Sequence, residues 1–297
     1  MGEMLMSRKM ILSLFLLAIL AVFRPERVSA NALPYQWEGA QGSEILVMED
    51  CPLQVKGETL LFQLEPQTSG HTLQSAVTAV YSLYNPTNEP CTVPAVFPII
   101  AAQRLENEQQ VLLNGEPLPC RLLPDSEPWQ EWTAGFFNLP EEEGYSGAEI
   151  RLLDFTLELA PGETARLEVR SATQAFMERD VVFHYITTET RYTFYYFLSP
   201  AQYWDSFEEL EIELQLSSAA PVLTETSLPF RWAGFRKYRY ESSGLPQGEL
   251  SFTASLPAWI WVLRIILGIV LAVAAILLIF WIKGRLSRKF SHPPKKK

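Results

Sequence analysis

Apolar and polar residues alternate along much of the chain with a period of two, not the 3.6 of an amphipathic helix. From Leu210 to Leu216 every second residue is leucine or isoleucine, and the residues between them are glutamate or glutamine. Successive side chains of a β-strand point to opposite faces, so this pattern predicts a strand with one buried and one solvated face.

Two further alternating segments lie on either side of a strong turn signal. Residues 151–159 and 165–170 both alternate, and Pro161-Gly162 lies between them. Pro-Gly favours a tight turn, and two alternating segments joined in this way are typical of a β-hairpin. We therefore expect these two segments to pair with each other.

Similar segments recur with turn residues about every 8 to 12 residues, the spacing of an antiparallel sandwich. The other candidate strands are 44–48, 58–65, 74–84, 91–99, 110–123 folded at Asn114-Gly115, 181–187, 191–198, 236–241 and 249–254. The predicted fold is all-β: an antiparallel β-sandwich, as one large or two consecutive sandwiches. Residues 124–146 break the rhythm and predict a long loop, so a sub-boundary is expected between 124 and 180.

A hydrophobic segment near the C-terminus predicts a transmembrane helix at residues 258–282. Trp259 to Ile282 contains one charge, Arg264, and seven lysines or arginines follow it without an acid. At about 1.5 Å per residue this segment is roughly 36 Å long, enough for a hydrocarbon core of about 30 Å. Because cationic loops stay in the cytoplasm, the tail at 283–297 is expected to lie inside.

The N-terminus carries the pattern of an export signal. Arg8 and Lys9 precede an apolar run at 10–23, and Val28-Ser29-Ala30 forms a small-residue cleavage site. We expect residues 1–30 to be removed and residues 31–257 to form an extracytoplasmic domain, in a type I membrane protein. An uncleaved anchor is the alternative. The C-terminal end lacks the Thr-Gly of a wall-sorting signal and the apolar end of a lipid-anchor signal.

Charge is distributed unequally between the predicted compartments. Residues 31–257 contain 12 Lys and Arg against 32 Asp and Glu, a net charge of −20, whereas the whole chain has −10. Nucleic-acid binding depends on cations that contact phosphate, so this acidic domain is not expected to bind nucleic acid. The plainer explanation of the charge is solubility at a crowded surface.

Cysteine content adds one expectation. Cys51, Cys91 and Cys120 all lie in the predicted exported domain. Three is an odd number, so we expect one intramolecular disulfide and one free or intermolecular thiol, with the connectivity open. Few cysteines and no Asn-x-Ser/Thr acceptor fit a bacterial surface protein.

The sequence contains no recognisable catalytic, metal-binding or cofactor-binding motif. Gly144-Tyr145-Ser146-Gly147 does not complete Gly-x-Ser-x-Gly, and His71, His184 and His292 are far apart in the sequence. No zinc motif, phosphate loop or calcium loop is present. We therefore predict no enzymatic activity and no cofactor.

Three groups of residues are candidates for binding. The first, between residues 230 and 240, interleaves cations and aromatics suited to anionic partners or lipid headgroups. The alternative is a structural strand whose cations pair with the domain's own acids. The binding candidates in this group are Arg231, Trp232, Arg236, Lys237 and Arg239.

The second group is Trp129 and Trp132 in the predicted loop, which suit sugar stacking or a protein partner; the alternative is a loop folded onto the sandwich edge. The third is in the span, where Gly268, Ala272 and Ala275 form a small-residue stripe that permits helix contact. Arg264 is expected to reach the outer membrane surface or to pair with an acid of a partner helix.

These observations predict a non-enzymatic, single-pass surface protein that binds, adheres or serves as an accessory subunit. Its expected partners are membrane lipid and another membrane or surface protein. The alternative is a membrane-anchored hydrolase of cell-wall polymer or polysaccharide, with scattered carboxylates as its site. A receptor-like sensor fits less well, because a 15-residue tail has no room for a signalling domain.

Overall fold

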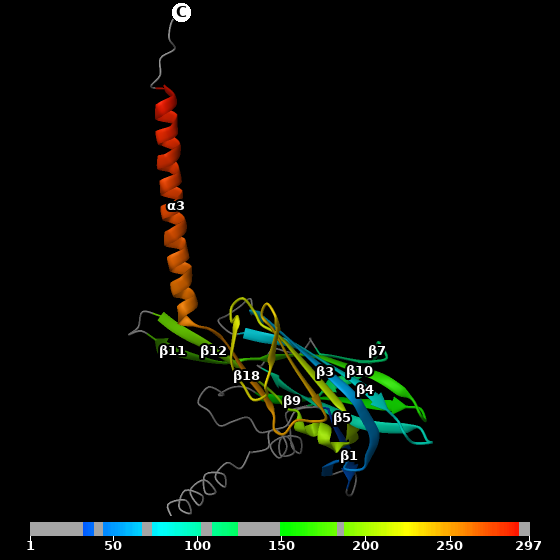
Figure 1. Cartoon of the computed structure of the whole chain (residues 1–297). Helices are drawn as coiled ribbons and strands as arrows, with labels where there is room; N and C mark the ends of the chain where they lie inside the picture. The colour runs from blue at the N-terminus through cyan, green and yellow to red at the C-terminus, as the bar shows by residue number, and fades with distance from the viewer. Residues whose placement is uncertain are drawn as a thin grey trace, which may run out of the picture.

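The computed structural model describes residues 32–38, 44–66, 73–101, 109–123, 149–182 and 187–290, and these form a β-domain followed by one long helix (Figure 1). The predicted fold class, an all-β sandwich with one C-terminal apolar helix, is confirmed. The predicted signal peptide and the whole loop at 124–146 lie outside the described residues.

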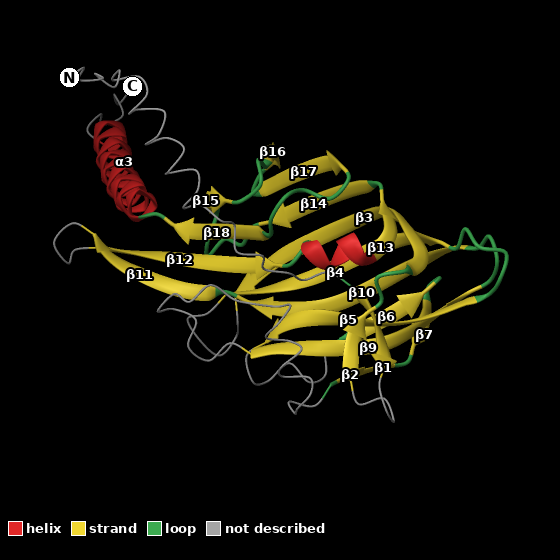
Figure 2. Ribbon diagram, turned by 90° about the horizontal axis from the view of Figure 1, so that it is seen from below, coloured by secondary structure: helices red, strands yellow, loops and turns green. Residues whose placement is uncertain are grey.

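The described strands form three sheets (Figure 2). The five-stranded sheet, in the order β2-β1-β5-β9-β8, contains β1 (Leu33–Glu38), β2 (Glu44–Val47), β5 (Cys91–Ala101), β8 (Cys120–Leu122) and β9 (Glu149–Leu159). The nine-stranded sheet has the order β16-β17-β14-β3-β4-β10-β6-β7, with β13 also paired to β3. The four-stranded sheet has the order β11-β12-β18-β15.

The other two sheets contain the remaining strands. The nine-stranded sheet contains β3 (Cys51–Pro66), β4 (Leu73–Tyr84), β6 (Gln110–Leu113), β7 (Glu116–Leu118), β10 (Thr164–Gln174), β13 (Trp204–Phe207), β14 (Glu209–Gln215), β16 (Arg231–Gly234) and β17 (Lys237–Ser243). The four-stranded sheet contains β11 (Phe176–Val182), β12 (Thr187–Tyr196), β15 (Val222–Thr226) and β18 (Leu250–Leu256). The 3-10 turn η1 (Ser199–Tyr203) precedes β13, and the helix is α3 (Ala258–Phe290).

The main core lies between one face of the nine-stranded sheet and the other two sheets. Phe62 of β3 meets Tyr196 of β12 and Phe252 of β18 edge-on, with ring centroids 5.5 and 5.3 Å apart. Phe97 of β5 lies 6.1 Å from Tyr196, so all three sheets meet around this tyrosine. The core contains residues from Ala32 to Ala254, and burying this apolar surface is the main force that holds the sheets together.

The predicted hairpin between 151–159 and 165–170 is wrong. β9 pairs with β5 and β8, whereas β10 pairs with β4 and β6, so Pro161-Gly162 carries the chain from one sheet to another. Buried Asn85 holds this corner: its amide donates to the carbonyls of Leu159 and Ala160, and its own carbonyl accepts from the Gly162 N–H. Alternation specifies a buried face but not the neighbouring strand.

The hairpin predicted at Asn114-Gly115 is confirmed. β6 and β7 pair across this turn, and both turn residues have positive φ, 53° and 86°. Asparagine and glycine tolerate this conformation better than other residues, and two such residues make the tight turn that suits the twist of a hairpin.

The cysteines differ from expectation, because all three are free. Cys91 and Cys120 flank β9 from opposite sides, opposite Leu159 and Phe155 respectively. Two strand spacings of about 4.8 Å separate β5 from β8, more than the Cα separation that a disulfide allows. Cys51 is buried, and this burial raises the pKa of its thiol to about 12.

Strand direction defines two ends of the domain. β18 runs into α3 through Pro257, so Leu256 marks what we term the helix end. β12 starts at this end because Thr190 pairs with Leu256, and β11 runs towards it, antiparallel to β12. β10 leads into β11 and therefore also runs towards the helix end. Its antiparallel neighbour β4 runs the opposite way, so β3, antiparallel to β4, runs towards the helix end again. β14 is parallel to β3 and shares its direction, and β17 is antiparallel to β14.

The helix α3 projects from the domain (Figure 1). Its segment Val262–Lys283 is long and apolar enough to cross a membrane, and none of it is buried within the protein. An apolar helix with exposed side chains needs an apolar solvent, so α3 is compatible with single-pass membrane anchoring.

Candidate functional site

The outward face of the nine-stranded sheet is polar and carries an open groove of about 900 Å³. The groove crosses β3, β4, β10, β14 and β17, because each strand sends alternate side chains away from the core. Register places Glu241, Glu211 and Thr59 in one row across three neighbouring strands. Sheet pairing, not sequence proximity, therefore assembles the lining.

One guanidinium group organises the carboxylates at one side of the groove. Glu211 and Glu241 are directly opposite each other on β14 and β17, where two like charges repel. Arg239 bridges them, with its Nη2 2.9 Å from a Glu211 oxygen and its Nε 2.7 Å from a Glu241 oxygen. The guanidinium and the two carboxylates thus place hydrogen-bond donors and acceptors of opposite charge side by side.

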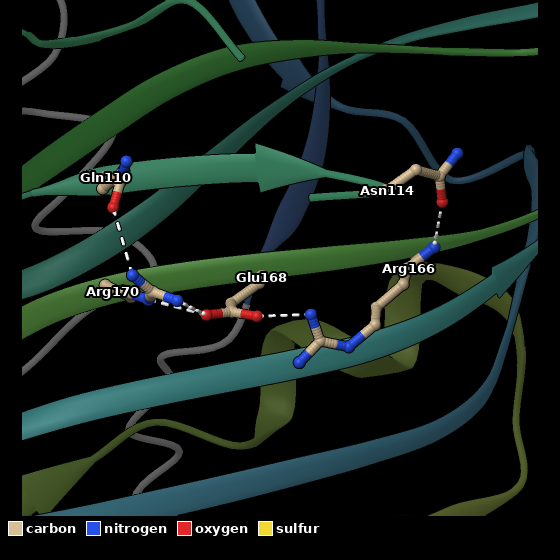
Figure 3. Close-up of polar contacts among 5 residues, drawn as sticks. All are labelled: Gln110, Asn114, Arg166, Glu168 and Arg170. Carbon is tan, nitrogen blue, oxygen red and sulfur yellow. Dashed lines mark hydrogen bonds and ion pairs between the residues drawn. The ribbon is translucent and has the colours of Figure 1, made fainter. Parts of the chain in front are cut away.

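A second charged cluster lies on β10 and is drawn in Figure 3. Glu168 pairs with Arg166 on one side and with Arg170 on the other, at 2.6 Å from the Arg170 Nε. The Glu168 side chain is only 7% exposed. Burial alone would raise the pKa of Glu168, but hydrogen bonds and charge from Arg170 and Arg166 outweigh it and hold this pKa below its usual range.

The same cluster is tied to the β6 edge. The Arg166 N–H donates to the Asn114 side-chain oxygen at 2.8 Å, and the Arg170 Nη1 donates to the Gln110 side chain at 3.4 Å (Figure 3). The first contact ties the Arg166 backbone to the β6 edge, and Glu168 holds the Arg166 guanidinium, which lines the groove, so one side of the groove is preorganised.

The predicted basic-aromatic group divides into two parts. Lys237 on β17 lies 3.2 Å from Glu213, and Arg239 is paired as described, while Tyr238 and Tyr240 are half-buried against the main core. These residues fit the structural alternative given for the group. Hydrogen bonds from Gln215, with a weaker contribution from Lys237, lower the pKa of Glu213 despite its burial.

The other part is the tip of the β16–β17 hairpin, where side chains are unpacked. Trp232 is 73% exposed and Phe235 is 82% exposed. Arg236 has a left-handed backbone, φ 58°, and its guanidinium lies 4.8 Å from the centre of the Phe235 ring, a cation–π distance. Arg231 pairs in register with Arg239 and is exposed.

Two further carboxyl groups, the buried Glu58 and the partly buried Glu249, carry no distinguishing sequence motif. Glu58 faces the core between Tyr196 and Tyr81, and the Tyr196 hydroxyl donates a hydrogen bond to it at 3.4 Å. Burial is the main cause that raises the pKa of both tyrosine hydroxyls. A register shift between Val55 and Gly57 precedes Glu58 in β3. The sequence did indicate that Glu58 is buried, because it lies in phase with the alternating buried residues that follow it in β3.

The second is Glu249, which precedes β18. Its carboxylate accepts hydrogen bonds from the N–H groups of Leu198 and Ser199 at the start of η1. Burial nevertheless raises the pKa of Glu249 to about 7, since no cation pairs with it among the interactions of the described residues. Nothing in the local sequence distinguishes it from the many exposed glutamates.

The other predicted residues lie apart from the groove. Arg264, Gly268, Ala272 and Ala275 are exposed along α3, and nothing lies within 4 Å of a Cβ placed on Gly268. Trp129 and Trp132 lie outside the described residues. Within the described ranges, no three His, Cys, Asp or Glu side chains form a group that could hold a metal.

No protein-family model and no curated protein sequence matches the chain. Among solved structures, a proposed nutrient binding protein of Legionella pneumophila is similar over 78% of this chain and 72% of its own, at 12% identity and a TM-score of 0.49. An M1 zinc metallopeptidase of Deinococcus radiodurans and a two-domain M1 zinc metallopeptidase are 12% and 14% identical, with TM-scores of 0.26. Both alignments cover 69% of this chain but only 39% of the metallopeptidase chains. At these identities and scores, the similarity assigns neither ligand nor activity.

Proposed function

We propose that the protein is a single-pass type I membrane protein whose exported β-domain binds a ligand without transforming it. The observation that carries the proposal is the preorganised open groove on the nine-stranded sheet, about 900 Å³ in volume. The charge asymmetry around residues 258–282 supports an outside domain and a cytoplasmic tail.

The chemistry of the groove favours a neutral, polyhydroxylated chain such as a glycan. Three outward carboxylates, Glu209, Glu211 and Glu241, accompany two arginines, so the lining repels an acidic polymer. Hydroxyl groups line it as well: Thr59, Ser82, Thr164 and Ser243. Carboxylate–guanidinium pairs offer acceptors and donors side by side, which matches the paired hydroxyls of a sugar ring.

Binding is favoured over hydrolysis because the two facing carboxylates, Glu211 and Glu241, are paired with a cation. A glycosidase needs one carboxyl group as acid and a second free to act as base or nucleophile. Here Arg239 pairs with both Glu211 and Glu241 across an open face, an arrangement that holds a ligand rather than enclosing a reacting bond. The membrane-anchored hydrolase remains the competing hypothesis.

Calorimetric titration of the full chain in detergent micelles with chitohexaose and cellohexaose tests the proposal. We expect binding of at least one oligosaccharide, weakened at least tenfold by Arg239→Gln, which removes the bridge between two carboxylates. Lys56→Gln is the matched control, since Lys56 pairs with Glu208 outside the groove lining and its loss leaves affinity unchanged.

The same samples distinguish the hydrolase. Mass spectrometry after prolonged incubation should show intact hexasaccharides. Shorter products that disappear in Glu211→Gln would establish hydrolysis instead. Failure of both oligosaccharides to bind would overturn the assignment of a neutral glycan to this groove.

A further inference from the structure

Exposed aromatic side chains of the β-domain are concentrated at one place. Among the described residues that precede α3, Trp232 and Phe235 are the only exposed large hydrophobic side chains. Both belong to the β16–β17 hairpin, whose turn contains Arg236 with a left-handed backbone conformation. Isolated apolar residues at a surface are ordinary, but two large aromatics at one hairpin tip form a patch that suits an apolar partner.

The hairpin tip lies at the helix end of the domain. β17 starts there because it is antiparallel to β14, and Lys237 pairs with Gln215 at the end of that strand. The Leu216 N–H donates to the Arg236 carbonyl at 2.8 Å, which fastens the tip to the same end. Figure 2 shows the start of β17 on the side of the sheet that faces α3.

The helix itself marks the level of the bilayer surface. Trp259 and Trp281 are exposed near the two ends of the apolar segment of α3, 22 residues and therefore about 33 Å apart. Tryptophan concentrates at the two interfaces of a membrane, so Trp259 indicates the headgroup level on the side of the β-domain. Only Pro257 and Ala258 separate it from β18, and this short connection keeps the helix end close to the membrane.

The charge of the tip is opposite to that of the domain. Residues 226–240 contain four cations and no acid, within a domain of net charge −20. Lys237 and Arg239 are paired with acids of the sheet. Arg231 and Arg236 form no ion pair within the described part of the chain, so their charge is available to anionic headgroups.

We propose that the tip of the β16–β17 hairpin docks onto the anionic bilayer that α3 spans, with Trp232 and Phe235 in the interface and Arg231 and Arg236 on the headgroups. This second attachment fixes the tilt of the domain, so the groove on the nine-stranded sheet has a set direction relative to the membrane. It does not depend on the ligand of the groove.

Photocrosslinking of the full chain in vesicles of phosphatidylcholine and phosphatidylglycerol at 7:3 tests this. Phe235→p-benzoylphenylalanine is expected to give a lipid adduct on irradiation, at least fivefold more than the same substitution at Glu116, an exposed position in β7 at the end away from the helix. Arg231→Gln with Arg236→Gln should lower the adduct at least fivefold, as should 0.5 M NaCl.

The matched control removes two cations elsewhere: Lys56→Gln with Arg121→Gln should leave the adduct unchanged. Equal adducts at positions 235 and 116, or none at 235, would overturn the proposal. A crosslinked dimer in place of a lipid adduct would show that a second copy of the chain covers the tip. Equal adducts in pure phosphatidylcholine would overturn the role of anionic lipid.

Discussion

The two parts of the cationic segment between residues 230 and 240 differ in how their charges are used. Lys237 and Arg239 lie on a paired strand, where Glu213, Glu211 and Glu241 neutralise them. Arg231 and Arg236 lie on the edge strand and the turn, where the described structure offers no acid. Equivalent residue types thus support the sheet in one place and remain available for binding in another, because sheet register alone assigns the partners.

Two carboxyl groups, one buried and one partly buried, show the same contrast. Glu168 is flanked by two arginines, and its pKa is held below the usual range. Glu249 has two backbone amides and the Ser199 side chain as hydrogen-bond partners but no cation among the described residues, and burial raises its pKa to about 7. Arginine partners thus offset the effect of burial at Glu168, and Glu249 has no such partner among the described residues.

The largest expected effect comes from the carboxyl group without a cation. Because the pKa of Glu249 is higher in the folded than in the unfolded chain, its protonated form stabilises the fold below pH 4.5, and this contribution is lost as the pH rises through 7. Glu249→Gln should therefore be more stable than the parent at pH 8, by up to about 3 kcal/mol, and similar at pH 4.5. Urea unfolding of the full chain in micelles at both pH values measures this; equal pH dependence in both proteins would contradict it.

Removing the paired carboxylate should destabilise the protein. Glu168→Ala leaves Arg166 and Arg170 on one face without their shared acceptor, and we expect a loss of about 2 kcal/mol in the free energy of unfolding, moderated by the partial exposure of both arginines. Arg231→Gln is the comparison variant from the hairpin tip and should change stability by less than about 0.5 kcal/mol. A larger loss in Arg231→Gln than in Glu168→Ala would reverse the distinction.

The smallest effect is expected at the turn. Arg236 has φ 58°, a conformation that costs a non-glycine residue about 1 kcal/mol. Arg236→Gly should therefore leave stability unchanged or raise it by about 0.5 kcal/mol, while removing a tip cation. Thermal unfolding compared with Arg236→Gln separates the backbone from the charge; a clear destabilisation by glycine alone would show that this side chain supports the fold.

Much of the fold could be predicted from the sequence, since long alternating segments report a buried face directly. β2, β4, β5, β9 and β14 were found in this way to within two residues at each end, and α3 was found but continues to Phe290, beyond the predicted end at 282. β1, β13, β15 and β16 were missed, and three of them pair along one side only; the strand expected at 181–187 covers only the last two residues of β11. The parallel pairing of β14 with β3 was also missed, since it joins segments about 150 residues apart and leaves no local pattern.

The sequence by itself determined the period-two pattern, the apolar helix and the presence of a cationic, aromatic segment, because these depend on residues close together in the chain. Tertiary structure decided which strands are neighbours, that Pro161-Gly162 links two sheets, and which cations meet an acid. Those outcomes depend on cross-strand contacts about 5 Å long between residues far apart in sequence. Register sets them, and register is a property of the assembled sheet.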